Sequence, residues 1–303
     1  MTELHVVTGA FSYTGKYITR RLLEKGIRVK TLTNHPDRVS PFDQPVETAP
    51  YDFDHPERLV ESLRGATTLY NTYWVRFAHG ETSHETAVKN TETLFRAAKA
   101  AGVRRIVHVS IANPDPASPL PYYSGKGRLE QLLESLGLEY AILRPTVIFG
   151  DEDILINNIA WLLRRFPVFG IPGDGAYRVQ PIYVEDFADL VVAAGRRRDN
   201  FIMNCVGPET CSFTDLVRLL ARTVGSRARI LHLPPMMALS IARCIGLFLG
   251  DVVLTRDEVA GLSVDLLAVD SQPTGTTRLT DWLRQHAATL GAVYHSELKR
   301  HYR

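Results

Sequence analysis

Tyr122 and Lys126 are the residues of this sequence best suited to acid–base chemistry. They stand four positions apart in the segment 122–126, which reads Tyr-Tyr-Ser-Gly-Lys. On the first turn of a helix, side chains at positions i and i+4 share a face, so the ammonium lies near the phenol and lowers its pKa. Such a phenol can exchange a proton with a carbonyl or alcohol oxygen. Surface packing is the alternative for a tyrosine and a lysine at this spacing, and Tyr123 is the tyrosine that we expect to pack.

A glycine-rich turn, residues 8–15, follows the first apolar run of the chain and reads Thr-Gly-Ala-Phe-Ser-Tyr-Thr-Gly. Gly9 can adopt the turn conformation that leaves a strand, and Gly15 lets the next helix pack close to a sheet, with its N–H groups turned toward a pyrophosphate. Ser12 replaces the middle glycine of a TGxxGxxG pattern, where the backbone approaches phosphate closely. We expect a nicotinamide-dinucleotide site here, with an ordinary tight turn as the alternative. Its expected contacts are Gly9, Phe11, Ser12, Tyr13, Thr14 and Gly15.

The end of the second apolar run bears on the choice between NAD and NADP. An acidic residue at this place would bond the ribose 2′-hydroxyl and repel a 2′-phosphate. The segment 33–38, Thr-Asn-His-Pro-Asp-Arg, has no acid at the strand end, and Asn34, His35 and Arg38 can hold a 2′-phosphate. We expect NADP(H) to be favoured over NAD(H), with a solvated loop as the alternative. After the third run, the expected adenine neighbours are Asp52 and Phe53.

The elements that position these residues follow from hydrophobic periodicity. Apolar runs of strand length alternate with segments of helical period, which is typical of a parallel sheet covered by helices on both faces. Strands are expected at 4–10, 29–34, 46–51, 67–74, 105–110 and 139–145. Helices are expected at 16–25, 58–63, 85–101 and 125–135. The pattern predicts an α/β protein with a Rossmann, doubly wound parallel sheet.

Beyond Pro145 the pattern changes to turns, loops and helices. A helix at 184–195 and a strand at 201–207 are expected to return to the sheet, and helices at 213–224, 236–249 and 279–290 to build a second lobe. We therefore predict a dinucleotide-binding Rossmann domain from residues 1–149 and 177–206. A smaller, mostly helical substrate or partner lobe is predicted from 150–176 and 207–303. Its apolar side chains can line a pocket or form a core: Trp161, Phe166, Phe169, Met236, Met237 and Phe248.

Composition narrows the function classes. With 45% hydrophobic and 22% charged residues, the 303-residue chain is typical of a globular protein. Its net charge of +2 provides no global field for nucleic acid or an anionic membrane, although a local patch stays open. The three cysteines lack CxxC spacing, and we expect neither a disulfide framework nor a metal site. The N-terminus lacks a signal-peptide pattern, so we expect a cytoplasmic protein. The apolar stretch 236–250 is too short for a transmembrane helix, and we expect it to form a buried or surface-docked helix.

Five separated segments resemble atypical or extended short-chain dehydrogenases/reductases. They read TGAFSYTGKYI, NTETLFRAAKAAGVRRIVHVS, YYSGK, YAILRPTVIFG and QPIYVEDFADL. The resemblance covers about residues 4–205 and is closest to NmrA-like proteins and to the complex I accessory subunit of that fold. This group contains epimerases, reductases, assembly factors and redox sensors, so its motifs do not define one reaction.

The resemblance implies catalytic roles for three residues. Tyr122 would exchange the proton while a nicotinamide exchanges hydride, and Lys126 would also hydrogen-bond the nicotinamide ribose. Ser110, at the end of the fifth strand, would hold the substrate oxygen. In many relatives this hydroxyl falls one or two residues later, where Ile111 and Ala112 stand. Contact with the cofactor or capping of the strand end is the alternative for Ser110.

The resemblance also places further cofactor contacts. The segments after the fourth and sixth strands would pass beside the nicotinamide and its ribose, with core packing of Tyr70 and Tyr73 as the alternative. The expected residues are Asn71, Thr72, Tyr73, Ser110, Lys126, Pro145, Thr146 and Val147. In the segment 183–186, Asp186 matches a position that stabilises a domain junction in relatives, so we expect a structural role.

These observations favour an NAD(P)-dependent oxidoreductase acting on a carbonyl or alcohol, with a bulky apolar substrate as one alternative. An epimerase or dehydratase with a retained cofactor fits the same motifs. A non-catalytic cofactor-binding assembly factor or redox sensor, with a protein complex as partner, is the alternative from another class. Nucleic acid is not expected as a partner, because the short runs 104–105 and 196–198 do not make a basic face.

Overall fold

The structure, a computed structural model, describes residues 3–80, 82–263 and 265–301. Its internal contacts divide the chain into two compact units, residues 1–145 with 185–204 and residues 146–184 with 205–303. The boundaries expected from the sequence differ at three short segments, 146–149, 177–184 and 205–206, all of which lie in the second unit. The strands of the first two segments find partners there. The pairs are β7 (Ile148–Phe149) with β10 (Ile182–Tyr183), and β9 (Arg178–Val179) with β12 (Cys211–Ser212).

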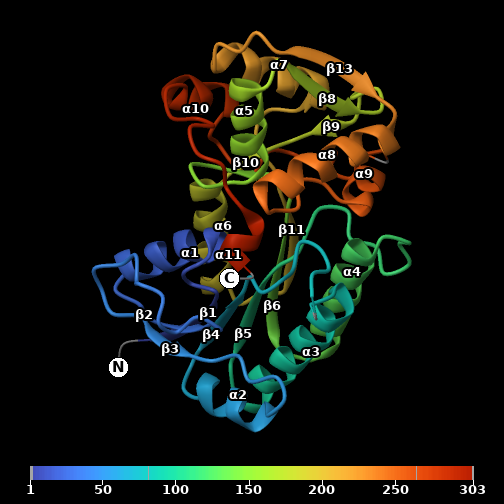
Figure 1. Cartoon of the computed structure of the whole chain (residues 1–303). Coiled ribbons are helices and arrows are strands. Elements are labelled where there is room, and N and C mark those ends of the chain that lie inside the picture. Colours follow the sequence, from blue (N-terminus) through green and yellow to red (C-terminus); the bar gives the residue numbers. More distant parts are fainter. Residues whose placement is uncertain (1–2, 81, 264, 302–303) are drawn as a thin grey trace. The chain divides into compact units, whose positions relative to one another are not determined.

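A seven-stranded sheet with the order β11-β6-β5-β4-β1-β2-β3 organises the first unit (Figure 1). Its strands are β1 (Leu4–Thr8), β2 (Arg28–Leu32), β3 (Glu47–Ala49), β4 (Thr68–Asn71), β5 (Arg105–Val109), β6 (Glu139–Pro145) and β11 (Phe201–Cys205). Neighbours from β3 through β6 pair in parallel. The predicted Rossmann fold class is confirmed. The strand order reverses between β1 and β4, and in such sheets ligands bind beyond the carboxyl ends of the strands at this reversal.

The helices of the first unit are α1 (Tyr13–Glu24), α2 (Pro56–Leu63), α3 (His84–Ala100), α4 (Pro121–Ser135) and α6 (Val184–Arg196). Leu59, Leu94, Phe95 and Leu129, from α2, α3 and α4, pack in one buried cluster against the sheet. Helix α4 begins four residues earlier than expected, because Pro121 is compatible with the first helical turn, where its missing N–H has no partner to lose. This start places Tyr122 on the first turn.

The second unit combines helices with short strand pairs. Its helices are α5 (Leu155–Arg165), α7 (Phe213–Thr223), α8 (Pro235–Leu249), α9 (Arg256–Ser263), α10 (Leu279–His286) and α11 (Glu297–His301). Strands β8 (Val168–Pro172) and β13 (Arg229–Leu233) pair in parallel over five residues, which the sequence pattern did not predict. A buried cluster that includes Phe149, Leu216 and Trp282 forms the core. Within the described residues, no helix is both long enough and apolar enough to cross a bilayer.

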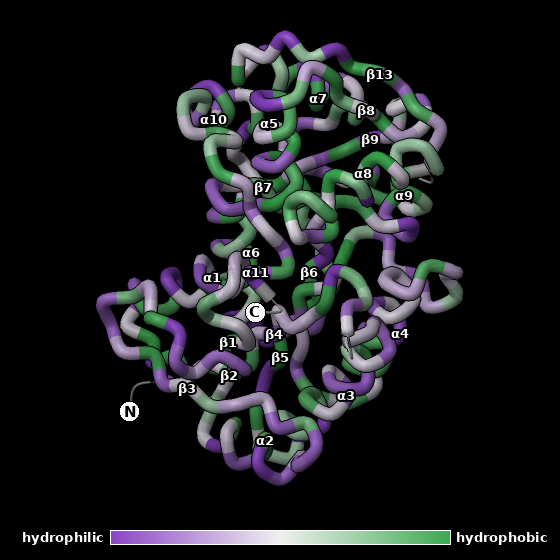
Figure 2. The backbone as a smooth tube through the Cα atoms, viewed as in Figure 1, coloured by the Kyte–Doolittle hydropathy of each residue, from purple (hydrophilic) through white to green (hydrophobic). Residues whose placement is uncertain are grey.

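The apolar side chains that we expected to line a pocket or form a core in this unit differ in their burial. Phe169 is buried, whereas Phe166, Met236, Met237 and Phe248 are exposed. Figure 2 shows that α8 is coloured mostly as hydrophobic along its length. The difference arises because periodicity defines a helix face but not what that face meets.

Candidate functional site

The glycine turn joins β1 to α1 at the point where the strand order reverses. Gly9 has a φ of 64°, in the left-handed region that favours glycine. The Ser12 N–H donates to the Gly9 carbonyl oxygen at 2.8 Å and closes the turn. A Cβ at Gly15 would lie 2.1 Å from the same oxygen. Both glycines are therefore required by the local geometry of the turn.

Ser12 stands where the TGxxGxxG pattern has its middle glycine, so its side chain must leave room for a pyrophosphate. The Ser12 hydroxyl donates to the Gly9 carbonyl oxygen at 2.6 Å, so the side chain folds back onto the turn. Among the described residues no side chain caps α1, and its first turn carries no acidic residue. The positive end of the helix dipole therefore suits an anionic group. Phe11, Tyr13 and Thr14 are half-buried around this turn.

Thr8 fastens the ends of β1 and β4 together. Its hydroxyl oxygen accepts from the N–H groups of Thr72, at 2.7 Å, and Tyr73, at 3.0 Å. In return the Thr72 hydroxyl donates to the Thr8 carbonyl oxygen at 2.5 Å. Asn71 is fully buried, and its amide nitrogen lies 3.1 Å from Nδ1 of His108. This network holds the segment 71–73 beside the glycine turn, with Thr72 and Tyr73 half-buried at the edge.

The expected adenine neighbours are both engaged with protein groups. Asp52 accepts from Arg58 at 3.0 Å and lies 2.8 Å from Nδ1 of His55, and the hydrogen bond with His55 is the main cause that lowers the pKa of Asp52. Phe53 packs against Tyr73, with the ring centroids 5.3 Å apart. The Tyr51 ring stacks on Phe53 at 5.2 Å. The aromatic rings of Tyr51, Phe53 and Tyr73 therefore pack together next to Asp52.

The loop after β2 carries the residues expected at a 2′-phosphate. Asn34 and His35 are exposed, and Arg38 is half-buried. The His35 N–H donates to the Thr33 hydroxyl at 3.0 Å, and the Arg38 N–H donates to the His35 carbonyl at 3.2 Å. The three side chains thus belong to one compact turn at the carboxyl end of β2.

Lys126 occupies a buried place on α4 behind β5. Its ammonium donates to the Val109 carbonyl oxygen at 2.8 Å, and only 2% of the residue is exposed. Burial lowers the pKa of Lys126 from 10.5 to about 7, against the opposing attraction of Glu130. The amine therefore exchanges its proton near neutral pH.

Trp74, which the sequence analysis did not single out, links Tyr122 to Lys126. The Lys126 ammonium lies 4.4 Å from the Trp74 ring centroid, and the Tyr122 ring meets Trp74 edge-on at 5.5 Å. His84, at the start of α3, stacks on Trp74 at 5.9 Å and meets the Tyr122 ring edge-on at 5.6 Å. A Cβ at Gly125 would lie 2.9 Å from Trp74, so this glycine admits the indole. The available sequence signal was that Trp74 is the last residue of the strand expected at 67–74.

Ser110 donates its hydroxyl hydrogen bond to the carboxylate of Glu130 on α4. Glu130 is 3% exposed and also accepts from Arg144 of β6, whose Nε lies 3.1 Å from one carboxylate oxygen. Ser110 and Glu130 thus form a buried polar group with Arg144 behind the strand ends. Two residues further along, Ala112 is buried, and Asn113 has a φ of 54°. Asn113 is a polar residue beyond β5 that the sequence analysis did not include among the candidates.

The segment after β6 divides between the two units. Pro145 belongs to the first unit, where its carbonyl oxygen accepts from the Ala112 N–H at 2.8 Å. Thr146 and Val147 belong to the second. There the Thr146 hydroxyl donates to the Gln180 carbonyl oxygen, and the Val147 carbonyl oxygen accepts from the Ile182 N–H at 2.8 Å.

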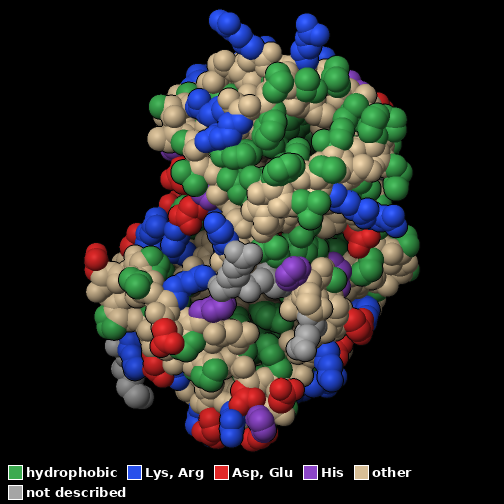
Figure 3. Space-filling view, in the orientation of Figure 1, with side chains coloured by type: hydrophobic (Ala, Val, Ile, Leu, Met, Phe, Trp, Pro, Cys, Tyr) green, Lys and Arg blue, Asp and Glu red, His purple; other side chains and the backbone are tan. Residues whose placement is uncertain are grey.

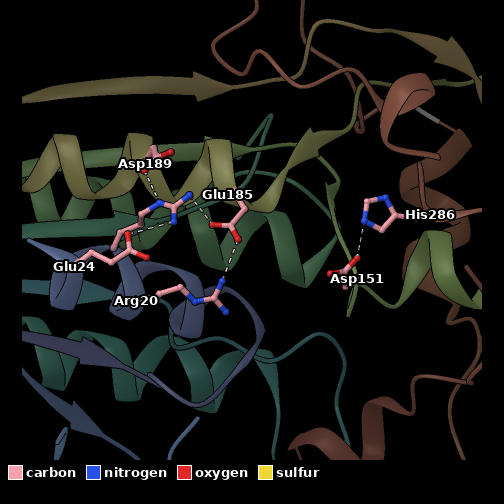
Figure 4. Close-up of polar contacts among 7 residues, drawn as sticks. Arg20, Glu24, Asp151, Glu185, Asp189 and His286 are labelled. Atoms are coloured by element: carbon pink, nitrogen blue, oxygen red, sulfur yellow. Dashed lines mark hydrogen bonds and ion pairs between the residues drawn. The ribbon is translucent and has the colours of Figure 1, made fainter. Parts of the chain in front are cut away.

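Ion pairs hold α1, which carries the glycine turn, against α6 (Figure 4). Arg21 contacts Asp189 and Glu185, each at 2.8 Å, and Arg20 contacts Glu185 at 3.2 Å. These pairs position the helix whose N-terminus faces the candidate pyrophosphate site. In the second unit, Figure 4 shows a separate pair, with Nε2 of His286 3.5 Å from Asp151.

Comparison with known proteins agrees with this geometry. Residues 9–158 match a family model described as NAD(P)H-binding. The chain contains an NAD(P)H-binding domain. The predicted class of cofactor is confirmed at this level, without a choice between NAD and NADP.

Curated relatives of this NAD(P)H-binding chain include a respiratory subunit and a reductase. Over 261 residues it is 24% identical to the mitochondrial 40 kDa subunit of NADH-ubiquinone oxidoreductase from Neurospora crassa, covering 84% of this chain and 68% of that protein. Over 243 residues it is 28% identical to the ceramide reductase of Caulobacter vibrioides, covering 75% and 73%. The predicted resemblance to the extended short-chain dehydrogenase/reductase group is confirmed.

Among solved structures, the fold is similar to that of the NADPH-dependent quinone oxidoreductase of Escherichia coli in complex with NADPH. The TM-score is 0.74 at 21% identity, and the match covers 93% of this chain and 99% of that one. Epimerases and reductases both occur among the structural neighbours, so the fold alone does not select a reaction.

Proposed function

We propose that this protein is an NAD(P)H-dependent reductase that acts on a carbonyl compound, with Tyr122 as the proton donor. The observation that carries the proposal is the side-chain cluster of Tyr122, Trp74 and Lys126 in the unit that holds the glycine turn. Both α4 residues contact the same indole, so their side chains share one face of the helix. Tyr122 remains half-buried and therefore accessible.

The residues of the chain divide the work of this reaction. The turn from Gly9 to Gly15 and the N-terminus of α1 would hold the pyrophosphate, and the segment 71–73 would lie beside the ribose. When bound, NAD(P)H supplies a hydride to the carbonyl carbon. Tyr122 gives its proton to the carbonyl oxygen, and protonated Lys126 stabilises the phenolate that remains.

Ser110 is proposed as a positioning residue in this reaction. Its hydroxyl donates to the buried Glu130, which supports a role in fixing α4 rather than in holding the substrate oxygen. Asn113, with its left-handed backbone beyond β5, is the candidate for that oxygen. Strained backbone of this kind is frequent at functional sites.

NADP(H) is the proposed cofactor in preference to NAD(H). The proposal is supported by the compact turn of Asn34, His35 and Arg38, which carries cationic and amide groups where a 2′-phosphate would lie. Strand β2 contains no acidic residue, and Asp37 in the loop after it is exposed.

The decisive experiment measures reduction of a panel of apolar ketones and quinones with NADPH and with NADH. Turnover with NADPH should fall by about 10²–10⁴-fold in Tyr122→Phe, because the proton donor is lost while the ring packing on Trp74 stays. The control is Tyr123→Phe, the buried neighbour, which should keep its turnover. Equal turnover in the wild type and in Tyr122→Phe would contradict the assignment.

A cofactor-binding subunit without catalysis is the second candidate function. It is favoured by the commitment of Ser110 to Glu130 and by the similarity to a respiratory-complex subunit. Tight NADPH binding without turnover on any carbonyl, together with co-purification with a membrane complex, would select it. An epimerase that retains its cofactor would instead interconvert isomers with no net consumption of NADPH.

A further inference from the structure

Helix α8 in the second unit turns an apolar face to the solvent. Its inward face is small and buried, with Ala238, Leu239, Ala242 and Gly246 packed against the unit. The outward face lies about half a turn away and follows the same helical spacing. It consists of Met236, Met237, Ser240, Ile241, Arg243, Cys244, Leu247 and Phe248.

The outward side chains of α8 are exposed to an unusual degree. Leu247 is 84% exposed and Phe248 is 94% exposed at the carboxyl end of the helix. Residues 252–254, which follow the helix, are apolar and half-buried, and Leu231 of β13 is an exposed apolar residue of the same unit. Figure 3 shows hydrophobic side chains gathered over the part of the second unit where α8, β8 and β13 lie. A surface of this kind in water usually marks a binding site.

The stretch of sequence that contains α8 carries positive charges only, and the next exposed acid is Asp257 of α9. Residues 216–250 contain no aspartate or glutamate, and the exposed cations of this stretch are Arg218, Arg222, Arg227, Arg229 and Arg243. The first acid after the helix, Asp251, is buried and accepts from the Tyr294 hydroxyl at 2.8 Å and from the Glu297 N–H at 3.0 Å. An apolar face within a basic, acid-free stretch is complementary to a surface that is apolar inside and anionic outside.

We propose that α8 binds the surface of an anionic lipid bilayer, with the helix lying in the plane of the interface. The 15 residues of α8 extend about 22 Å, less than the roughly 30 Å of a hydrocarbon core, so the helix lies on the bilayer rather than across it. Leu247 and Phe248 enter the acyl region, and Arg243 on the same outward face contacts a lipid phosphate. A protein partner would need a pocket for these two projecting side chains, whereas a bilayer accepts them anywhere on its surface. The proposal does not depend on the reductase reaction.

Flotation of the full-length protein with lipid vesicles tests the proposal. The wild type should float with vesicles containing phosphatidylglycerol, float less with pure phosphatidylcholine, and be released as salt rises, because salt screens the arginine–phosphate attraction. The double variant Leu247→Ser/Phe248→Ser should bind at least about tenfold more weakly, since two large apolar side chains no longer enter the acyl region. The matched control is Val39→Ser, which removes an 88% exposed apolar side chain from the other unit and should float like the wild type.

Three results would overturn the proposal. The wild type could fail to float with anionic vesicles, or the double variant could float as well as the wild type. The third is a lipid-free dimer, seen by light scattering, that the double variant abolishes, because α8 would then be an interface between two copies of this chain.

Discussion

Helices α4 and α8 make an informative pair. Each has 15 residues and begins with a proline, yet their side chains are distributed in opposite ways. Helix α4 buries two charged residues, Lys126 and Glu130, at 2% and 3% exposure. Helix α8 leaves Leu247 and Phe248 almost completely exposed. Neither arrangement is what the stability of the fold alone would favour.

Both proposals place function where side chains contradict their solvation preference. In α4 the cost of burying charge is offset by the Arg144 pair, the Trp74 ring and a shifted protonation state. In α8 no group of the described residues covers Leu247 and Phe248, and the proposed bilayer would cover them. The predictions below test each half of this comparison.

The largest expected effect concerns the buried acid of α4. Arg144→Met should lower the free energy of unfolding by about 3–5 kcal/mol, because Glu130 is left charged and buried without its guanidinium. Urea denaturation measures the change. The double variant Glu130→Leu/Arg144→Met, which removes both charges, should recover most of the loss. A loss below 1 kcal/mol in the single variant would mean that the pair does not compensate the burial of Glu130.

Burial of Lys126 should make the free energy of unfolding depend on pH. Because the pKa of Lys126 is lowered to about 7 in the folded protein, the unfolded chain binds one more proton between about pH 7 and 10.5. The free energy of unfolding of the wild type therefore rises as the pH increases from about 7 to 10.5. Below about pH 7 the buried amine is charged in the folded protein, and the full destabilisation by Lys126 is present. Lys126→Met should thus stabilise the protein at pH 6, with a gain about 2–3 kcal/mol smaller at pH 9.

The control for this pH effect is Lys89→Met, which removes an exposed lysine from α3. Its effect on the free energy of unfolding should be the same at pH 6 and pH 9. If Lys126→Met also shows no pH dependence, the lysine is not buried in the way that the comparison of the two helices requires.

A smaller effect is expected for Ser110→Ala. Loss of the hydrogen bond to the Glu130 carboxylate should lower the free energy of unfolding by about 1–2 kcal/mol. Turnover should change by less than about tenfold, because the hydroxyl positions α4 and does not touch the substrate. Steady-state kinetics and urea denaturation separate the two readouts. A loss of turnover beyond about a hundredfold with unchanged stability would assign Ser110 to the substrate oxygen instead.

The smallest effect is expected on α8. Leu247→Ser/Phe248→Ser should change the free energy of unfolding by no more than about 0.5 kcal/mol, since the two side chains make little contact in the folded chain. Leu239→Ser, on the buried face of the same helix, should lower it by about 2 kcal/mol or more. Equal losses in the two variants would show that the outward face is covered in solution.

Much of the fold could be predicted from local patterns. Strand β6 has the predicted bounds. Helix α3 begins one residue before the expected position, where Ser83 caps its N-terminus by accepting from the Thr86 N–H. The five-residue pairing of β8 with β13 was not predicted, because it joins segments about 60 residues apart that no local period connects. The same limit applies to Trp74, which becomes part of the site only through the contact between the end of β4 and α4.

The sequence by itself determined the alternation of strands and helices, the glycine turn at the first crossover and the shared face of Tyr122 and Lys126. These features depend on backbone sterics and on periodicities of two and 3.6 residues, which are local properties of the chain. Only the tertiary structure decided that Ser110 serves Glu130, that Lys126 is buried enough for its pKa to fall to about 7, and that the apolar face of α8 points outward. Burial and partners depend on which elements pack together, and no local pattern encodes that choice.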